Sequence, residues 1–132
     1  DKLEGHDPGL IGIMCLTPHV VELKSIIMRL RLIYPGIPII VGGPHFSTVP
    51  DDYERVSADA VCAGDGEEVI VRVANEVESN RKCLSQIYTS EKWIVDVDRW
   101  PIPARHLTDI SRYQYFIKEE RAATLMTQRG CP

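Results

Sequence analysis

The residues best placed to bind a ligand stand at the ends of three apolar runs in the first part of the chain. These runs lead from Gly9 to Leu16, from Ile37 to Val41 and from Asp59 to Ala63, and each one stops at a turn. The turns contain Leu16, Thr17, Gly42, Gly43, Pro44, Gly64 and Gly66. Continuous apolar runs are typical of strands buried on both faces of a parallel sheet, and ligands of such sheets bind just beyond the carboxyl ends of the strands. We therefore expect the chemistry of this chain at these turns.

Carboxylates and histidines near the same turns have simpler explanations than catalysis. Asp65, followed three residues later by Glu68, resembles a capping box, and the helix dipole favours the charge of Glu67 in a first turn. His19 and His45 follow strand ends, but neither has the further ligands that a metal site needs. We expect capping or solvated roles for all of these side chains, and no catalytic residue in this chain.

The cysteines divide into a structural group and one exception. Cys15 and Cys62 lie inside apolar strands, and neither they nor Cys83 form a pair with the spacing of metal ligands. This usage indicates a reducing compartment. Cys131 differs, because it is a lone cysteine in the glycine turn Gln128–Pro132.

Composition limits the possible classes of protein. A length of 132 residues with 44% apolar residues suits one domain of the usual size, roughly 100–150 residues. The net charge of −4 arises from 15 basic and 19 acidic residues without a basic cluster, so we expect no nucleic-acid partner. No apolar segment approaches the roughly 20 residues of a membrane span, and Asp1–Glu4 does not open a signal peptide. We expect a soluble, cytoplasmic protein with no membrane contact.

Periodicity predicts helices between the apolar runs. Thr17 is a candidate helix cap with Pro18 in the first helical position, and the helix is expected to end near Tyr34, before Pro35-Gly36. Its expected core positions are Leu23, Ile26, Ile27, Leu30 and Ile33. A short helix is predicted from Pro50, with Tyr53 and Val56 facing the sheet. The helix after Asp65 is expected to bury Val69, Ile70, Val73 and Val77.

The second part of the chain is less regular. Ile87-Tyr88 and Trp93–Val95 are candidates for a small hairpin, Trp100–Ala104 reads as a semi-rigid linker, and Ala122–Met126 as a last strand. The sequence thus divides into an α/β domain over residues 1–80, a hairpin and proline-rich linker over 81–121, and the start of a further domain over 122–132.

Alternating strands and helices predict an α/β fold, a doubly wound parallel sheet of the Rossmann or flavodoxin-like type with right-handed crossovers. The three strong strands are fewer than the roughly five that are usual in such open sheets, so we expect the domain to be incomplete at its amino end. One sheet edge would then be bare, covered by a second copy of the chain or a swapped segment.

Five motifs in order give the chain a resemblance to a known family. They are Ile11-Gly12-Ile13 with Thr17-Pro18-His19, Val41-Gly42-Gly43-Pro44-His45, Gly64-Asp65-Gly66-Glu67-Glu68, Trp100-Pro101-Ile102-Pro103-Ala104-Arg105 and Gln128-Arg129-Gly130-Cys131-Pro132. Together they are similar to the cobalamin-binding domain of cobalamin-dependent radical S-adenosylmethionine enzymes, a family of methyltransferases and an anaerobic magnesium-protoporphyrin monomethyl ester cyclase. The resemblance implies cobalamin over the carboxyl ends of the strands, with its nucleotide tail beside the first strand and the pair Gly42-Gly43, where glycine permits close backbone approach. A glycine pair that simply makes the turn is the structural alternative.

Two departures from related cobalamin domains bear on the site. Domains of the methionine synthase type carry Ser-x-Leu where this chain has Met14-Cys15-Leu16, so a serine hydroxyl toward the nucleotide base is missing. Their Asp-x-His-x-x-Gly motif is mimicked by Glu4–Gly9, but this segment immediately precedes the first strand, so we read His6 as a surface residue. We expect bound cobalamin to receive no histidine ligand from this chain.

Cys131 resembles the first cysteine of the Cys-x-x-x-Cys-x-x-Cys motif that holds the 4Fe-4S cluster of radical S-adenosylmethionine enzymes. The resemblance implies that the cluster and S-adenosylmethionine belong to a longer parent protein, because one thiolate cannot hold the cluster. The chain itself is then a non-catalytic cobalamin-binding portion of an enzyme for methyl transfer or oxidative cyclisation. The alternatives are a flavodoxin-like module for another nucleotide ligand or a protein partner, and a structural remnant without a competent pocket.

Overall fold

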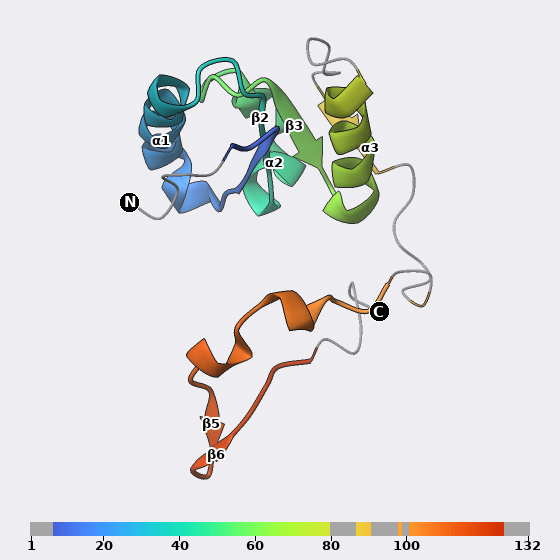
Figure 1. Ribbon diagram of the computed structural model, residues 1–132. Coiled ribbons are helices and arrows are strands. Elements are labelled where there is room, and N and C mark those ends of the chain that lie inside the picture. Colours follow the sequence, from blue (N-terminus) through green and yellow to red (C-terminus); the bar gives the residue numbers. More distant parts are fainter. Residues whose placement is uncertain (1–6, 80–86, 91–97, 99–100, 126–132) are drawn as a thin grey trace. The chain divides into compact units, whose positions relative to one another are not determined.

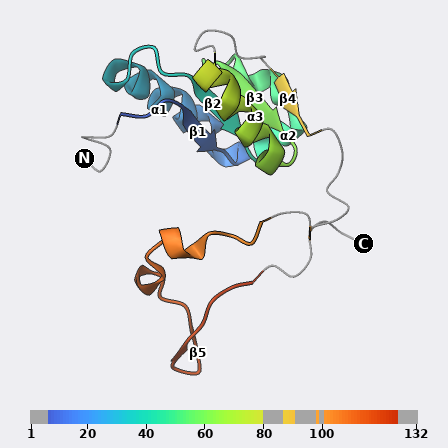
Figure 2. The same cartoon turned by 45° about the vertical axis from the view of Figure 1, so that its right-hand side comes forward.

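The computed structural model describes residues 7–79, 87–90, 98 and 101–125. The chain divides into two compact units, Asp1–Trp93 and Ile94–Pro132. The elements of the first unit (Figure 1 and Figure 2) are β1 (Ile11–Met14), the 3₁₀ helix η1 (Thr17–His19), α1 (Val20–Ile33), β2 (Ile39–Gly42), α2 (Pro44–Thr48), the 3₁₀ helix η2 (Pro50–Tyr53), β3 (Ala60–Ala63), α3 (Gly66–Ser79) and β4 (Ile87–Thr89). His6, Cys83, Trp93–Val95 and Cys131, which entered the sequence predictions, lie outside the described residues.

The strands form one parallel sheet in the order β1-β2-β3-β4. In register, Ile40 of β2 lies between Gly12 of β1 and Ala60 of β3, and Cys62 lies beside Tyr88 of β4. The predicted α/β class with a parallel sheet is confirmed.

Helices cover both faces of this sheet because side chains alternate along each strand. On one face Ile39, Val41 and Val61 pack with the buried side of α1. On the other face Ile40 and Ala60 pack with the valines of α3, which Figure 2 shows in front of the strands. The doubly wound arrangement is therefore confirmed.

The crossovers differ from the expectation that all are right-handed. The chain steps in one direction across the sheet at every connection, whereas α1 and α3 lie on opposite faces. Two parallel crossovers that step the same way over opposite faces have opposite hands, so one of them departs from the usual right-handed rule. The departure arises because β4 pairs at the β3 edge and places Tyr88 beneath α3.

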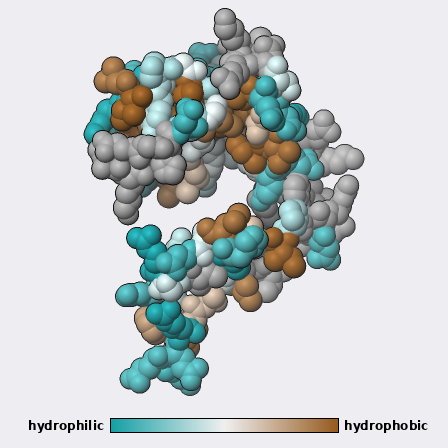
Figure 3. Space-filling view, in the orientation of Figure 1, coloured by the Kyte–Doolittle hydropathy of each residue, from teal (hydrophilic) through white to brown (hydrophobic). Residues whose placement is uncertain are grey.

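Helix α1 buries a narrower stripe than its sequence predicts. Leu23, Ile27 and Leu30 are buried, but Ile26 and Ile33 are 48% and 59% exposed, so the prediction for these two is wrong. Only the i, i+4 and i+7 positions of the helix pack with the strand side chains, and Ile26 and Ile33 lie outside that stripe. Apolar surface consequently remains over α1, visible in brown in Figure 3.

The starts of the helices also differ in detail. Thr17 does not cap α1, because it is the first residue of η1 and no side-chain cap bond is made there. The strand end at Gly42 continues into α2, which the sequence did not predict.

The predicted burial of side chains on the later helices is confirmed in part. Tyr53 and Val56 are buried as predicted, whereas Ile70 of α3 is 42% exposed instead of buried.

Strand β4 extends the main sheet. Ile87 and Tyr88 form a strand, as predicted, and this strand pairs in parallel with β3 within the first compact unit. The predicted hairpin partner Trp93–Val95 lies outside the described residues, and the domain boundary near residue 80 stays a prediction.

The second unit is described by itself. It contains η4 (Arg105–Leu107), η5 (Ile110–Arg112) and the antiparallel pair β5 (Phe116–Ile117) and β6 (Glu120–Arg121). Residues 101–104 have no regular structure, as expected of a proline-rich linker. The strand predicted over Ala122–Met126 is wrong for residues 122–125, because the positive φ angles of Lys118 and Glu119 place the hairpin turn earlier. Within the described part of the chain, no helix is long and apolar enough to cross a membrane.

Candidate functional site

The turns singled out in the sequence meet at the carboxyl edge of the sheet. The Cys15 amide donates to the carbonyl of Gly42 at 2.9 Å, and the His45 amide donates to the carbonyl of Cys15 at 3.3 Å. The Ser47 hydroxyl links the next turn, because it donates to the Gly43 carbonyl and accepts from the Gly64 amide, each at 3.0 Å. The residues after β1, β2 and β3 are therefore held together as one edge (Figure 1).

The pair Gly42-Gly43 is required by the packing of this edge. Gly43 has a φ of +95°, and a Cβ there would lie 2.8 Å from Met14 Cγ and 3.0 Å from the Cys15 carbonyl oxygen. A Cβ on Gly42 would lie 3.3 Å from the Cys62 carbonyl oxygen. The space that side chains would need at these positions is filled by the chain's own atoms, so both glycines serve the turn whatever else they contact.

The third turn has a similar backbone requirement. Gly64 has a φ of +93°, and its missing Cβ would lie 3.1 Å from Ser90 Oγ. Gly66 is the first residue of α3, and Pro44 is the first residue of α2, where proline is well tolerated. Pro44 and Gly64 are exposed at this edge.

One face of β1 is open beside these turns, a feature that the sequence analysis did not assign to the site. Gly12 points to the face that carries Ile40 and α3, and a Cβ there would meet only Ile40 Cγ2, at 3.9 Å. Met14, two residues further on the same face, is 70% exposed. We call these two residues the open face of β1. A glycine inside a strand is the signal that could have identified it, because such a glycine often marks close approach of another group.

Helix α3 borders this open face with an apolar flank. Arg72 stacks over the Tyr88 ring, 5.2 Å from its centroid, and the Tyr88 hydroxyl donates to Glu76, so this flank of α3 faces β4. At 100° per residue, Ile70 and Ala74 fall on the opposite flank, toward β1. The 42% exposure of Ile70 agrees with a neighbouring face that no protein element covers among the described residues.

His45 was expected to be solvated or capping, and this expectation is wrong. Only 7% of the residue is exposed, and its ring packs edge-to-face on Phe46 with a centroid distance of 4.9 Å. Nδ1 lies 3.3 Å from Thr17 Oγ1 and Nε2 lies 3.2 Å from Asp52 Oδ2. The ring therefore joins the turn after β1 to η2, and no local pattern in the sequence indicates these two contacts.

Asp52 is held as a carboxylate in this arrangement. Arg55 Nη1 lies 3.1 Å and 3.0 Å from its two oxygens. Hydrogen bonding from the Arg55 guanidinium, aided by His45 and opposed by partial burial, lowers the pKa of Asp52 below its usual value. An ionised carboxylate only accepts hydrogen bonds, so Nε2 of His45 donates to Asp52.

The other histidines and cysteines of the described residues have ordinary surroundings. Among the described residues, no three His, Cys, Asp or Glu side chains are grouped closely enough to hold a metal ion. His19 is exposed, with its Nδ1 3.7 Å from Glu22. Burial raises the pKa of the Cys15 and Cys62 thiols, so both cysteines act as small apolar residues at neutral pH.

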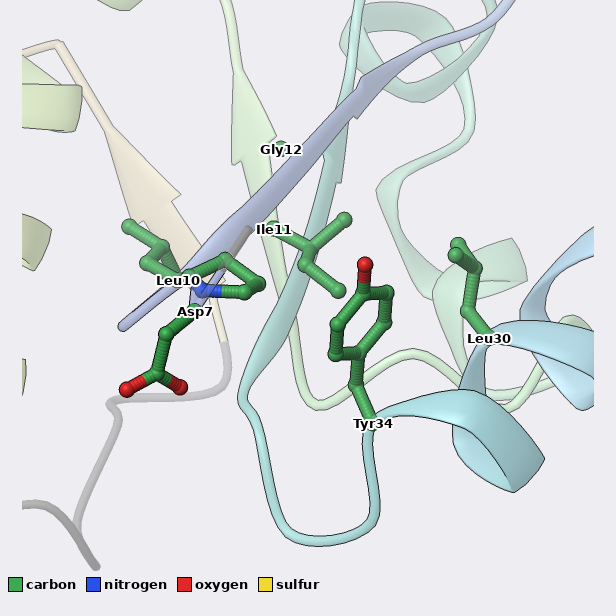
Figure 4. A pocket seen from close by; sticks show the side chains of 7 residues that line it. Asp7, Leu10, Ile11, Gly12, Leu30 and Tyr34 are labelled. Carbon is green, nitrogen blue, oxygen red and sulfur yellow. The ribbon is translucent and has the colours of Figure 1, made fainter. Parts of the chain in front are cut away.

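A separate pocket of about 440 Å³ lies at the amino end of β1. Figure 4 shows Leu10, Ile11 and Gly12 from the strand region and Leu30 and Tyr34 from α1 and the residue after it. Gly12 therefore borders both this pocket and the open face of β1. Because β1 is an edge strand of the sheet and this pocket is at its beginning, it is distinct from the turns at the carboxyl edge.

The chain is similar in sequence to parts of two longer proteins. The chain is 25% identical to an uncharacterised methyltransferase of Pyrococcus horikoshii over 96% of this chain and 30% of that protein. It is 23% identical to the anaerobic magnesium-protoporphyrin IX monomethyl ester cyclase of Rubrivivax gelatinosus over 100% of this chain and 27% of that protein. The chain thus spans less than a third of the length of these relatives, and no solved structure matches it.

The family assignment rests on the first unit. The model of the B12 binding domain matches residues 1–74, which include the three turns and the open face of β1. This match covers more than half of the chain, and it agrees with the parallel sheet and the helices on both of its faces. The chain belongs to the B12-binding domain family.

Proposed function

We propose that the chain binds cobalamin across the carboxyl edge of the sheet, with the nucleotide tail along the open face of β1. The open face carries this proposal, because it offers an apolar surface without a cover among the described residues, directly beside the three turns. Gly12 leaves room for a flat group over Ile40, and Met14 and Ile70 border it with apolar surface. The residues proposed to contact the cofactor from the turns are Leu16, Thr17, Gly42, Gly43, Pro44, Gly64 and Gly66.

The side chains at this edge suit a cofactor that brings its own metal ligands. A corrin ring already coordinates cobalt through its nitrogens, so the protein needs apolar contact and hydrogen bonds instead of a ligand cluster. The described residues supply these, and they contain no metal-binding group of three side chains. When bound, cobalamin supplies a cobalt that carries a methyl group or an electron. His45 has both ring nitrogens engaged, so we propose that it does not ligate the cobalt.

The larger reaction is a proposal about a longer parent protein. The names of the two relatives indicate methyl transfer and ring cyclisation, and the chain spans under a third of each. We propose that the parent is a cobalamin-dependent radical S-adenosylmethionine enzyme in which Cys131 is the first ligand of a 4Fe-4S cluster. The chain itself holds the cobalamin, and the radical chemistry belongs to the remainder of the parent.

The bare edge of β1 fits the expectation of a further strand. Its outer backbone groups have no strand partner among the described residues, and the pocket bounded by Leu10 and Tyr34 lies beside it. We propose that a preceding segment of the parent, or a segment of a second copy of the chain, pairs with this edge.

A titration of the full chain with hydroxocobalamin, followed by gel filtration, tests the cofactor proposal. We expect the visible absorbance of the corrin to travel with the wild-type protein. In the variant Gly12→Leu the side chain occupies the open face, so we expect the affinity to fall by at least about tenfold, which corresponds to roughly 1.4 kcal/mol of binding free energy.

Gly9→Leu is the matched control for this variant. A Cβ at Gly9 meets nothing within 4 Å, and Gly9 precedes β1 instead of lying on its open face. We expect Gly9→Leu to bind cobalamin like the wild type. Equal retention by Gly12→Leu and Gly9→Leu would contradict a tail on the open face, and no retention by the wild type would contradict cobalamin binding by this chain.

A further inference from the structure

The connected side chains Thr17, His45, Asp52 and Arg55 lie in the first unit and extend to the proposed cofactor site. Asp52 and His45 are 16% and 8% exposed at their side chains, whereas Thr17 is exposed at the turn after β1. These hydrogen-bonded side chains therefore connect the largely buried carboxylate of Asp52 to the exposed hydroxyl of Thr17. That hydroxyl lies at the surface where we propose that cobalamin binds.

The protonation state of His45 determines what the Thr17 hydroxyl offers to a ligand. When His45 is neutral, its one N–H at Nε2 donates to Asp52, and Nδ1 accepts the hydrogen of the Thr17 hydroxyl. The oxygen of Thr17 then has only lone pairs left for a ligand. When His45 is protonated, Nδ1 also carries a hydrogen and donates it to Thr17 Oγ1, which frees the hydroxyl hydrogen for an external acceptor.

We propose that His45 is a positioning residue that controls the direction of the Thr17 hydroxyl, so that its protonation strengthens the binding of the phosphate in the nucleotide loop of cobalamin. This inference rests on the proposed function of the site. The phosphodiester is an anionic acceptor, and hydrogen bonds to charged acceptors are stronger than those between neutral groups. Histidine is the type of side chain whose charge responds to mildly acidic to neutral pH, so a change of pH is the way to test this role.

The surroundings of His45 leave few other groups that could cause such a pH dependence. From η2 it faces Asp52, which is bound to Arg55, and Tyr53 follows Asp52 in the chain. Burial raises the pKa of Tyr53, and Asp52 has a lowered pKa, so neither titrates between about pH 5 and 8. From the end of β1 the nearby thiol is Cys15, whose pKa burial raises. From η1 the titratable group is His19, which is exposed next to Glu22.

Binding of cyanocobalamin by the full chain, followed by its visible spectrum between about pH 5.5 and 8, tests the inference. We expect the wild-type affinity to rise by about tenfold from the alkaline to the acidic end of this range. Thr17→Val removes the hydroxyl from an exposed position where the fold tolerates the change, and we expect it to bind with a pH-independent affinity. His45→Gln should also lose the dependence, whereas Thr17→Ser should restore it.

Two controls separate the proposed cause from others. His19→Asn removes the neighbouring titratable side chain and should keep the pH dependence of the wild type. Cobinamide, which lacks the nucleotide loop and its phosphate, should bind the wild type without the pH dependence. A dependence that persists in Thr17→Val, or that is equal for cobinamide and cyanocobalamin, would overturn the inference.

A second measurement works even if the chain binds no cobalamin. Nitrogen NMR of the free protein identifies which ring nitrogen of neutral His45 carries the hydrogen. We expect hydrogen on Nε2 in the wild type and a changed tautomer population in Asp52→Asn. If the wild type binds no corrinoid, the proposed function fails, and with it the link to the phosphate. Hydrogen on Nδ1 of neutral His45 in a protein that does bind cobalamin would overturn the positioning role alone.

Discussion

On one face of the sheet α1 covers β1, whereas on the other face α3 leaves Gly12 and Met14 of β1 uncovered among the described residues. Ile11 and Ile13 of β1 pack against the core beneath α1, but Gly12 and Met14, which alternate with them, are exposed. The same strand is thus core on one side and surface on the other. Another group can therefore be accommodated on this surface without disturbing the core, as a cofactor-binding face requires.

The largest loss of stability is expected from a substitution on the sheet face that α1 covers. Ile27 of α1 is 0% exposed and lies in the core with Val41 and Val61. Ile27→Ala leaves a cavity there, so we expect it to lower the free energy of unfolding by about 4 kcal/mol in urea denaturation. Ile26→Ala, next to it but 48% exposed, is the control and should cost less than about 1 kcal/mol. Equal losses would mean that α1 does not pack as described.

Glycine substitutions sharpen the comparison between closed and open positions. Gly43→Ala forces a side chain into a backbone of positive φ against Cys15, so we expect a loss of about 3 kcal/mol of stability. Gly12→Ala adds its methyl group on the open face, and we expect a change within about 0.5 kcal/mol. Thermal or urea unfolding of the two variants measures this difference. A large loss in Gly12→Ala would show that the face is not open in solution.

The smallest change in the free energy of unfolding at neutral pH is expected from substitution of Asp52. Its pKa is lower in the folded chain than in an unfolded one, so its ionised form stabilises the fold at neutral pH. This contribution is lost as the pH falls below about 4 and through the folded pKa. Urea unfolding of wild type and Asp52→Asn should therefore differ at neutral pH and converge in acid.

Asp51→Asn is the control for the acid measurement. Asp51 neighbours Asp52 in η2 but its side chain is exposed, so we expect its substitution to leave the acid dependence of stability close to that of the wild type. An unchanged acid slope in Asp52→Asn would contradict the role assigned to its bonds with Arg55 and His45.

Local patterns in the sequence were sufficient to predict the strands that carry the site. The three apolar runs form β1, β2 and β3, and the turns after them lie together at the carboxyl ends of these strands. The prediction was possible because uninterrupted apolar stretches bounded by glycine turns are typical of strands buried in a parallel sheet. The cobalamin assignment came from the order of motifs, and the match to the B12 binding domain over residues 1–74 confirms it at the level of the family.

The features that the sequence did not predict depend on contacts between distant residues. Ile26 and Ile70 fit a helical period but face away from a sheet that is too small to cover them. Tyr88 pairs with Cys62 of β3, and nothing local to its segment indicates this pairing. His45 was missed because its partners, Thr17 and Asp52, stand 28 and 7 residues away in the chain.

The strand order β1-β2-β3-β4 also has a consequence for how the chain folds. Every strand pairs with the strand that precedes or follows it in the sequence, so no pairing in the described sheet requires a strand from a distant part of the chain. Topologies with short sequence separation between partners close small loops first and fold faster than sheets with reordered strands. We expect the sheet to assemble strand by strand as each crossover is completed, so that β1, β2 and α1 can pair while later residues are still being synthesised.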